Sequence, residues 1–195
     1  MDGLDLPVPG RLRHPRRLLP RPHRGIEPPP PLVRASHPDP GNVTDLAALP
    51  VERLDHVSVA VWDLRTAARL PELLGGRLLD GGRSGDFWWA QWELHGGKLE
   101  MIQPVDPDDA DHFLVRFLRR RGEGLHHLTF KVTDLTLAVE RAEAAGFRVV
   151  DVDRSSPTWK EAFIHPKTAS GVLIQLAEFE DAPPRYPASL DEVLG

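Results

Sequence analysis

Residues 124–132 read GLHHLTFKV, and they decide the fold because residues 53–61, RLDHVSVAV, repeat their pattern. Successive side chains of a strand point to opposite faces of a sheet. Each stretch therefore predicts a strand with a histidine and a hydroxyl side chain on one face and apolar side chains on the other. His56 and His127 occupy equivalent places in the two strands. A single histidine of this kind is often a buried hydrogen-bonding group, but its repetition favours a shared functional site.

The sequence around these strands repeats as well. An amphipathic helical stretch that ends at glycine follows each of them, and three further predicted strands follow the helix. Residues 51–105 and 122–180 thus predict two βαβββ modules of one α+β domain, residues 51–180. Within the first module, we expect a loop at residues 81–86 and a tight turn at residues 96–97.

The two ends of the chain differ from this domain. Residues 1–50 contain 12 of the 20 prolines and many arginines, and they lack a regular apolar period. This composition predicts a disordered Pro/Arg-rich tail, although the arginines could also form a polyanion-binding arm or a targeting peptide. Residues 181–195 are polar and contain prolines, so we expect a C-terminal tail there.

Composition narrows the classes of function. The chain has 195 residues and no cysteine, which excludes disulfides, thiolate metal sites and cysteine nucleophiles. A net charge of −5 argues against nucleic acid as a partner. No stretch approaches the roughly 18 apolar residues of a membrane span, and no signal peptide is evident. We therefore expect a cytoplasmic protein with no membrane partner, which could pair as a homodimer.

One polar residue interrupts the apolar run of the last strand in each module: Glu100 in KLEMI and Gln175 in VLIQL. A buried carboxylate is costly unless it is paired or bound to a cation. The separations are parallel, with 44 residues from His56 to Glu100 and 48 from His127 to Gln175. Two equivalent pairs predict one four-ligand metal site. Alternatively, Glu100 lies on an exposed face beside Lys98, and Gln175 is a buried hydrogen-bonding amide.

The segments LDHVSVAV, KLEMIQP, GLHHLTFKV and FIHPKTASGVLIQLAEF together resemble the vicinal oxygen chelate superfamily, which has the glyoxalase and bleomycin-resistance fold. Within that superfamily, they are most similar to the methylmalonyl-CoA epimerases. The resemblance covers about residues 54–179 and implies βαβββ modules that curve into an incomplete barrel around a divalent ion such as Co, Mn, Zn, Ni or Fe. At the matching positions of this chain, the resemblance implies four metal ligands: His56, Glu100, His127 and Gln175.

The chain departs from the epimerase pattern at two places. Epimerases have a glutamate where Gln175 stands, and a neutral amide should retain a metal ion less tightly than a carboxylate does. A family catalytic glutamate near the start of the third strand also has no evident counterpart, because residues 83–86 offer Ser84 and Asp86 instead. Asp86 is therefore one candidate for the catalytic base.

Glu93 is the other candidate base. A turn at residues 96–97 would pair Glu93 with Glu100 and place both on the face of the site. A register shift of one residue would instead present Trp88 and Trp92 on that face. Either carboxylate could remove a proton from carbon next to a carbonyl group.

Three functions compete on this basis. The first is a metal-dependent isomerase or epimerase-like enzyme that acts on a small carbonyl substrate or an acyl-CoA thioester. The second is an iron(II)-dependent dioxygenase, because His56, His127 and Glu100 form a two-histidine, one-carboxylate set. The third is a non-catalytic, resistance-type protein that binds a flat compound with stacking side chains. Those side chains would be Phe87, Trp88, Trp89 and Trp92.

Overall fold

The computed structural model of the chain describes residues 47–195. The Pro/Arg-rich tail predicted for residues 1–50 lies outside the described residues, except for its last four. Among the helices of residues 47–195, none is long and apolar enough to cross a membrane.

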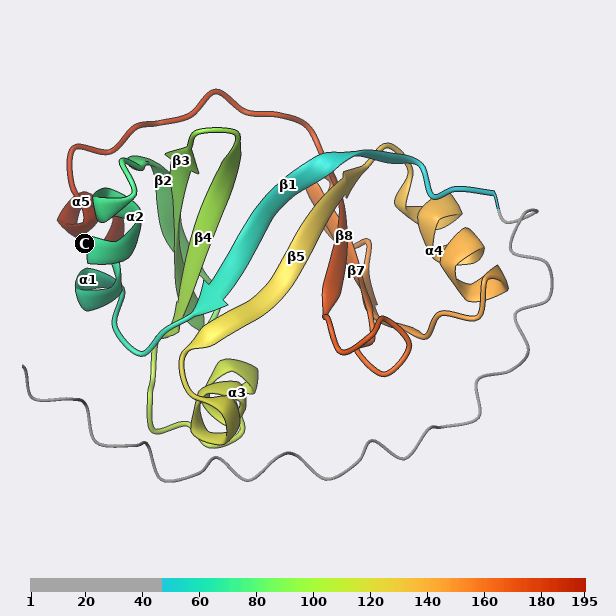
Figure 1. Ribbon diagram of the computed structural model, residues 1–195, viewed down its shortest axis with the longest axis horizontal. Helices are drawn as coiled ribbons and strands as arrows, with labels where there is room; N and C mark the ends of the chain where they lie inside the picture. The colour runs from blue at the N-terminus through green and yellow to red at the C-terminus, as the bar shows by residue number, and fades with distance from the viewer. Residues whose placement is uncertain (1–46) are drawn as a thin grey trace, which may run out of the picture. The chain divides into compact units, whose positions relative to one another are not determined.

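Eight strands form one mixed sheet in the order β2-β3-β4-β1-β5-β8-β7-β6 (Figure 1). The chain passes twice through strand, helix and three strands, which confirms the predicted paired βαβββ modules and the α+β fold. The sheet does not close on itself, as expected for an incomplete barrel. Its strands are β1 (Val51–Ala60), β2 (Arg77–Ser84), β3 (Phe87–Leu94), β4 (Gly97–Pro104), β5 (Gly124–Val132), β6 (Val149–Asp153), β7 (Trp159–Ile164) and β8 (Ile174–Phe179).

The two histidine-bearing strands lie side by side at the centre of the sheet. β1 and β5 are antiparallel, and Ser58 is the register partner of His127. Each central strand is flanked by the last strand of its own module in parallel, so that Ser58 pairs with Glu100 and Thr129 pairs with Gln175. The four strands that carry the predicted metal ligands are therefore adjacent.

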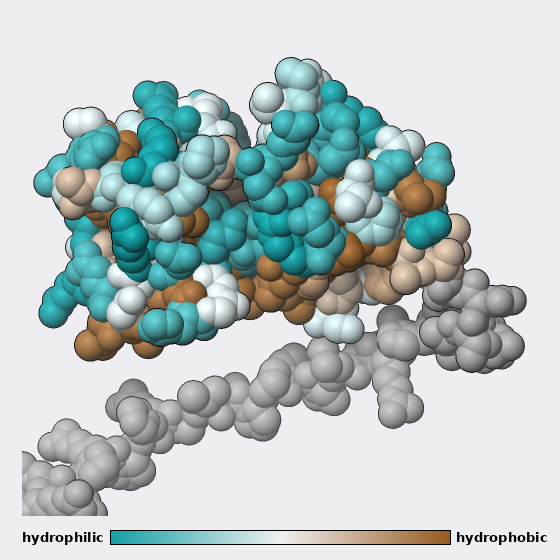
Figure 2. Space-filling model, turned by 90° about the horizontal axis from the view of Figure 1, so that it is seen from above, coloured by the Kyte–Doolittle hydropathy of each residue, from teal (hydrophilic) through white to brown (hydrophobic). Residues whose placement is uncertain are grey.

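Helices cover mainly one face of the sheet, which we call the outer face. In Figure 1, α1 (Leu64–Ala67), α2 (Arg69–Leu73) and α5 (Leu190–Leu194) lie beside the first module, and α4 (Leu135–Ala144) lies beside the second. Apolar residues of both modules pack beneath these helices in two clusters. On the opposite, inner face, α3 (Phe113–Arg121) packs against Ala60 and Ile102. Seen from above, the surface is hollowed between the two halves (Figure 2).

The loop predicted at residues 81–86 is wrong, because β2 continues to Ser84 and pairs with β3 as far as Phe87. The glycine that suggested a loop instead permits close packing. A Cβ atom on Gly81 would lie 2.5 Å from Cγ1 of Val193 and 2.8 Å from the carbonyl oxygen of Trp89. Only the turn between β2 and β3, at residues 85–86, remains irregular.

The β3–β4 hairpin turns one residue earlier than the sequence predicted. Leu94 pairs with Gly97, so the turn residues are 95 and 96, and Gly96 takes the positive φ of 92° that this turn needs. Gln91 therefore lies opposite Glu100, whereas Glu93 lies opposite Lys98. The predicted pairing of Glu93 with Glu100 is wrong by two residues. A shift of two keeps Glu93 on the same face but moves it toward the strand end.

The four aromatic side chains of β3 do not form one stacking surface. Trp88 and Trp92 pack in the outer cluster with α1, whereas Phe87 and Trp89 pack on the inner face with α3. The strict alternation of side chains along a strand separates the two pairs. The arrangement expected for a resistance-type binding protein is therefore not present on β3.

The segment expected to be a C-terminal tail packs onto the first module and ends in α5. The amide of Tyr186 donates to the carbonyl of Leu79 at 2.9 Å, at the edge of β2. Arg185 bonds to the side chain of Asp80 and the carbonyl of Gly81. These contacts cover an edge strand that would otherwise expose unpaired backbone groups.

Candidate metal centre

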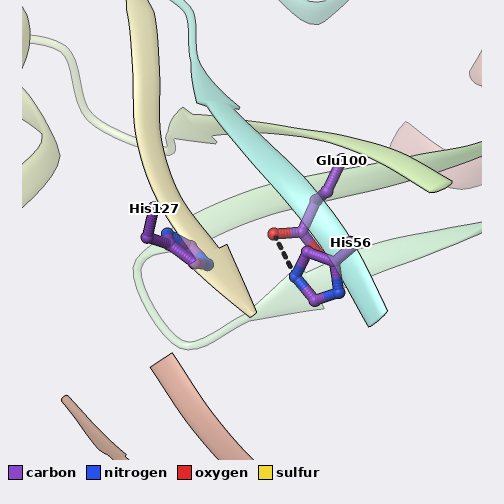
Figure 3. A group of neighbouring side chains, drawn as sticks. All are labelled: His56, Glu100 and His127. Atoms are coloured by element: carbon purple, nitrogen blue, oxygen red, sulfur yellow. Dashed lines mark ion pairs between the residues drawn. The ribbon is translucent and has the colours of Figure 1, made fainter. Parts of the chain in front are cut away.

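Three buried side chains point toward one another on the inner face of the sheet (Figure 3). His56 comes from β1, Glu100 from β4 and His127 from β5, and one nitrogen or oxygen of each lies within 4.8 Å of the others. They converge because Ser58 is the register partner of both Glu100 and His127. We call these three residues the His-Glu-His cluster.

Asp55 fixes the ring of His56. A β-bulge between Leu54 and His56 leaves Asp55 without a register partner in β5. Two consecutive side chains can therefore both be buried, with exposed fractions of 4% for Asp55 and 2% for His56. Oδ2 of Asp55 accepts a hydrogen bond from Nδ1 of His56 at 2.9 Å, and Nε2 of that ring lies 3.5 Å from Glu100. Carboxylates orient metal-binding histidines in this way.

Cations in turn hold Asp55. Its two oxygens accept hydrogen bonds from Nζ of Lys98 at 2.8 Å, and Oδ1 also accepts one from Nη2 of Arg53 at 2.9 Å. Burial by itself would raise the pKa of Asp55, but the hydrogen bonds from His56 and Lys98 outweigh it and hold that pKa well below its usual value. A carboxylate in this state is a weak base, so its part in the site is to position His56.

Hydrogen bonds around Gln175 assign the protons of His56. Nε2 of Gln175 donates to Oε2 of Glu161 at 2.6 Å, so Oε1 of Gln175 faces Thr129 and accepts its hydroxyl proton at 2.5 Å. The Thr129 oxygen lies 2.9 Å from Nε2 of His56 and, having given away its only proton, must accept one there. His56 thus carries a proton on each ring nitrogen.

The pKa values agree with this assignment. Burial would lower the pKa of His56, but the charge of Glu100 and the hydrogen bond to Asp55 raise it to about 9. Burial would likewise raise the pKa of Glu100, but the charge of His56 lowers it to about 2. Because the pKa of His56 exceeds its ordinary value of 6.5, its charge stabilises the fold below about pH 6.5, and this contribution is lost as the pH rises through 9.

His127 has the opposite protonation. Burial lowers its pKa to about 3, although the charge of Glu100 opposes the shift, so the ring is neutral at physiological pH. Its Nδ1 lies 2.8 Å from Nδ1 of His126, whose pKa burial lowers to about 4. When His127 is the donor in this pair, its Nε2 keeps the free lone pair that a metal ion requires. Phe117 of α3 packs against His126 with ring centroids 4.8 Å apart.

Glu100 provides the test of whether a metal ion fits. Its oxygens accept hydrogen bonds from Ser58 at 3.0 Å and Gln91 at 2.9 Å, and it is 9% exposed. Within residues 47–195, His56 is the only basic side chain at ion-pair distance from it. A buried carboxylate needs a balancing cation, a role that protonated His56 fills here and that a divalent ion could fill in its place. The two imidazoles beside Glu100 complete a donor set that suits a divalent transition metal. The residues present therefore fit such an ion.

The other predicted site residues lie farther out. Gln175 reaches His56 through the Thr129 hydroxyl group, and its side chain also opposes the lowering of the His127 pKa. Asp86 is exposed in the β2–β3 turn, and Glu93 is exposed and accepts a hydrogen bond from the hydroxyl of Tyr186 at 3.3 Å. Across the described part of the chain, neither carboxylate forms a hydrogen bond or ion pair with the His-Glu-His cluster.

Three residues that support the cluster were not predicted from the sequence: Asp55, His126 and Glu161. The first two stand next to predicted ligands, in the doublets Asp-His and His-His. Strict alternation assigns such neighbours to the opposite face, so the strand pattern does not predict that they join the site. Their charge and hydrogen-bonding capacity were the available signal. Glu161 alternates with the apolar residues of β7 and is recognisable only by that pattern.

Uptake of a divalent ion at neutral pH should release about one proton. His56, with a pKa of about 9, must lose its Nε2 proton to bind, whereas His127, with a pKa of about 3, is already neutral. The apparent affinity for Mn²⁺ should therefore rise about tenfold per pH unit below pH 9 and level off above it. Calorimetry in two buffers of different ionisation enthalpy measures the released proton. A binding heat that is the same in both buffers would contradict the assignment.

Comparisons with known proteins agree on one group of relatives. The family model of the Glyoxalase/Bleomycin resistance protein/Dioxygenase superfamily matches residues 55–163, more than half of the chain. The uncharacterized protein YqjC of Bacillus subtilis is 30% identical over 133 residues, which cover 66% of this chain and 93% of YqjC. The ethylmalonyl-CoA/methylmalonyl-CoA epimerase of Cereibacter sphaeroides is 28% identical over 66% of this chain and 98% of its own length.

A solved structure gives the same result. The crystal structure of methylmalonyl-CoA epimerase from Mycobacterium tuberculosis superposes with a TM-score of 0.61 and 31% sequence identity. The match covers 70% of this chain and 93% of that protein. The likeness thus extends over nearly the whole of the relative and over more than two thirds of this chain.

Proposed function

This chain belongs to the Glyoxalase/Bleomycin resistance protein/Dioxygenase superfamily, and from that premise we propose that it is an epimerase-like enzyme that moves a proton on carbon next to the carbonyl of an acyl-CoA thioester. The observation that carries the proposal is the His-Glu-His cluster, which is buried on the inner face of the sheet. The proteins similar to this chain include methylmalonyl-CoA epimerases. The names of those relatives supply the substrate class.

A hydrogen on the carbon next to a thioester carbonyl is only weakly acidic. The reaction therefore needs a group that stabilises negative charge on the carbonyl oxygen and a base that removes the proton from the carbon. A divalent ion bound by His56, Glu100 and His127 would supply Lewis acidity for that oxygen. The protein's own residues prepare the ligands: Asp55 orients His56, and Ser58 and Gln91 hold the two oxygens of Glu100. Such fixed orientation lowers the cost of reorganisation during the reaction.

Gln175 is proposed as a fourth ligand. Its Oε1 is already on the side of the cluster, 2.5 Å from the hydroxyl of Thr129. A metal ion held by Nε2 of His56 would replace the hydrogen bond from that nitrogen to Thr129, and Oε1 of Gln175, on the neighbouring strand β8, would supply a neutral oxygen ligand.

Solvent exchange tests the proposed reaction. Protein purified without chelators is assayed for metal and then incubated with methylmalonyl-CoA in deuterium oxide. The expected result is incorporation of one deuterium beside the thioester carbonyl, read by mass spectrometry, and its abolition by chelator. Absence of exchange with full metal content would overturn the proposed function.

One geometric observation supports a second candidate. Two histidines and one carboxylate within 4.8 Å are also the ligand set of non-haem iron(II) oxygenases. Oxygen uptake by the iron(II)-loaded protein in the presence of substrate separates this candidate from an epimerase, whose reaction consumes no oxygen.

The Gln175→Glu variant should bind a divalent ion more tightly than the wild type. A carboxylate oxygen adds negative charge to the ligand set, and the new side chain would also repel Glu161, to which Nε2 of Gln175 now donates at 2.6 Å. A bound cation relieves that repulsion, so both effects favour the loaded form. Competition with a chelator measures the affinity. An unchanged or weaker affinity would mean that Gln175 only supports Thr129.

A further inference from the structure

The proposed reaction needs a base, and most carboxylates near the cluster are unavailable for that role. Glu100 is buried and engaged by Ser58, Gln91 and His56. Asp55 is bonded to His56 and also to two cationic side chains. Both are therefore poor proton acceptors, since a carboxylate that is stabilised in its charged form has little affinity for a proton.

Glu161 reaches the same site from β7. Along this strand, Ala162 and Ile164 pack in the outer cluster, so Glu161 and Phe163 point to the inner face. The ring of Phe163 packs edge-on against His127 with centroids 6.2 Å apart. Glu161 itself accepts the hydrogen bond from Gln175, whose other end contacts Thr129. Its carboxylate thus lies beside the His-Glu-His cluster but outside it.

The bonding of Glu161 is that of an available base. Oε2 accepts hydrogen bonds from Nε2 of Gln175 at 2.6 Å and from Nε1 of Trp159 at 2.8 Å, and both donors are neutral. Within residues 47–195, no lysine or arginine forms an ion pair with this carboxylate, and Oε1 forms no hydrogen bond. Glu161 is half-buried, so that oxygen can meet a substrate. The two hydrogen bonds to Oε2 also fix the direction in which Oε1 points.

We propose that Glu161 is the catalytic base, an inference that rests on the proposed function. In the forward step, the C–H bond next to the thioester carbonyl breaks and its electron pair moves toward the carbonyl group, giving an enolate. The proton forms an O–H bond with Oε1 of Glu161. In the return step, the O–H bond breaks and a C–H bond forms again, and because Glu161 exchanges its proton with solvent in between, solvent hydrogen enters the product. Inversion follows when solvent protonates the opposite face of the enolate and Glu161 releases its proton to solvent.

The variant Glu161→Gln tests the assignment, because it keeps the shape of the side chain and an oxygen for Gln175. Its rate of deuterium exchange into methylmalonyl-CoA should fall by at least about a hundredfold, the usual effect of losing a general base. Its metal content and melting temperature should match those of the wild type. The Glu161→Asp variant, which retains a carboxylate, should keep measurable exchange. Glu140→Gln makes the same chemical change on the exposed surface of α4 and should leave exchange unchanged.

The outcomes separate the possible failures. If the wild type shows no exchange, the proposed function fails, and the role of Glu161 fails with it. If the wild type exchanges and Glu161→Gln exchanges equally fast, only the base assignment is overturned. A joint loss of metal and exchange in Glu161→Gln would also overturn it, because the residue would then only position Gln175. Loss of exchange in Glu93→Gln, with Glu161→Gln active, would assign the base to Glu93 instead.

Discussion

Replacement of His127 with alanine should leave the protein unable to retain a divalent ion. His127 supplies one of the two imidazoles in the cluster and is only 6% exposed, so its removal leaves one imidazole and one carboxylate in a buried site. Loss of a residue that merely orients a ligand weakens metal binding by about 10- to 100-fold. Loss of the ligand itself should exceed that range, and deuterium exchange should disappear with the metal.

Metal analysis after dialysis, combined with chelator competition, measures this effect. His95→Ala is the matched control, because it removes an exposed histidine in the β3–β4 turn. That variant should keep full metal content. Stoichiometric metal of wild-type affinity in His127→Ala would show that the ion binds elsewhere.

The Asp55→Asn variant should bind a divalent ion about 10- to 100-fold more weakly than the wild type. Asn can offer one oxygen to His56, but it has no charge to balance His56, Lys98 and Arg53. The variant should also lose up to about 3 kcal/mol of unfolding free energy, the lower end of the range for a broken buried ion pair, because Lys98 and Arg53 reach solvent.

The pH dependence of that loss identifies its cause. Because the pKa of Asp55 is lowered in the folded protein, its charge stabilises the fold above the ordinary value of 3.8, and the contribution is lost as the pH falls below it. The difference in unfolding free energy between the wild type and Asp55→Asn, measured by denaturant unfolding, should therefore become smaller at low pH. Asp181→Asn is the control, since Asp181 also bonds to Arg53 but does not touch His56. Its metal affinity should be unchanged.

The position of the base decides how far this chain resembles its epimerase relatives in mechanism. The sequence offered Asp86 and Glu93, both on the first module, but the structure leaves both exposed and without contact to the cluster in the described residues. Glu161 lies on the second module, beside Gln175. One departure from the epimerase pattern, the amide at position 175 on β8, thus lies next to the proposed base, whereas the other lies on the first module, at residues 83–86.

Much of the site could be predicted because it depends on local periodicity. His56 and His127 were found from a strand pattern that repeats, and Glu100 from a single charge in an apolar run. Strand alternation is fixed by the backbone, so the face on which each side chain lies follows from the sequence around it. Glu93 was correctly placed on the face of Glu100 for this reason, although its partner was wrong.

The details that failed depend on contacts between distant segments. The observed β3–β4 register differs by two residues from the predicted one because the turn is formed by residues 95 and 96, with Gly96 at positive φ. A turn at residues 96–97 would also have glycines to form it, so the sequence does not distinguish the two. The burial of Asp55 depends on a bulge in the pairing of β1 with β5. The docking of α5 depends on Val193, which packs directly against Gly81 of β2.

The sequence by itself thus determined the two modules, most of their strands and three convergent side chains, since a period of two residues and a repeat are properties of neighbours along the chain. Tertiary structure alone decided which groups surround those side chains. Asp55 meets His56 through a bulge, and Glu161 meets Gln175 across two antiparallel strands. Such contacts depend on register, and register is set by the packing of the whole sheet.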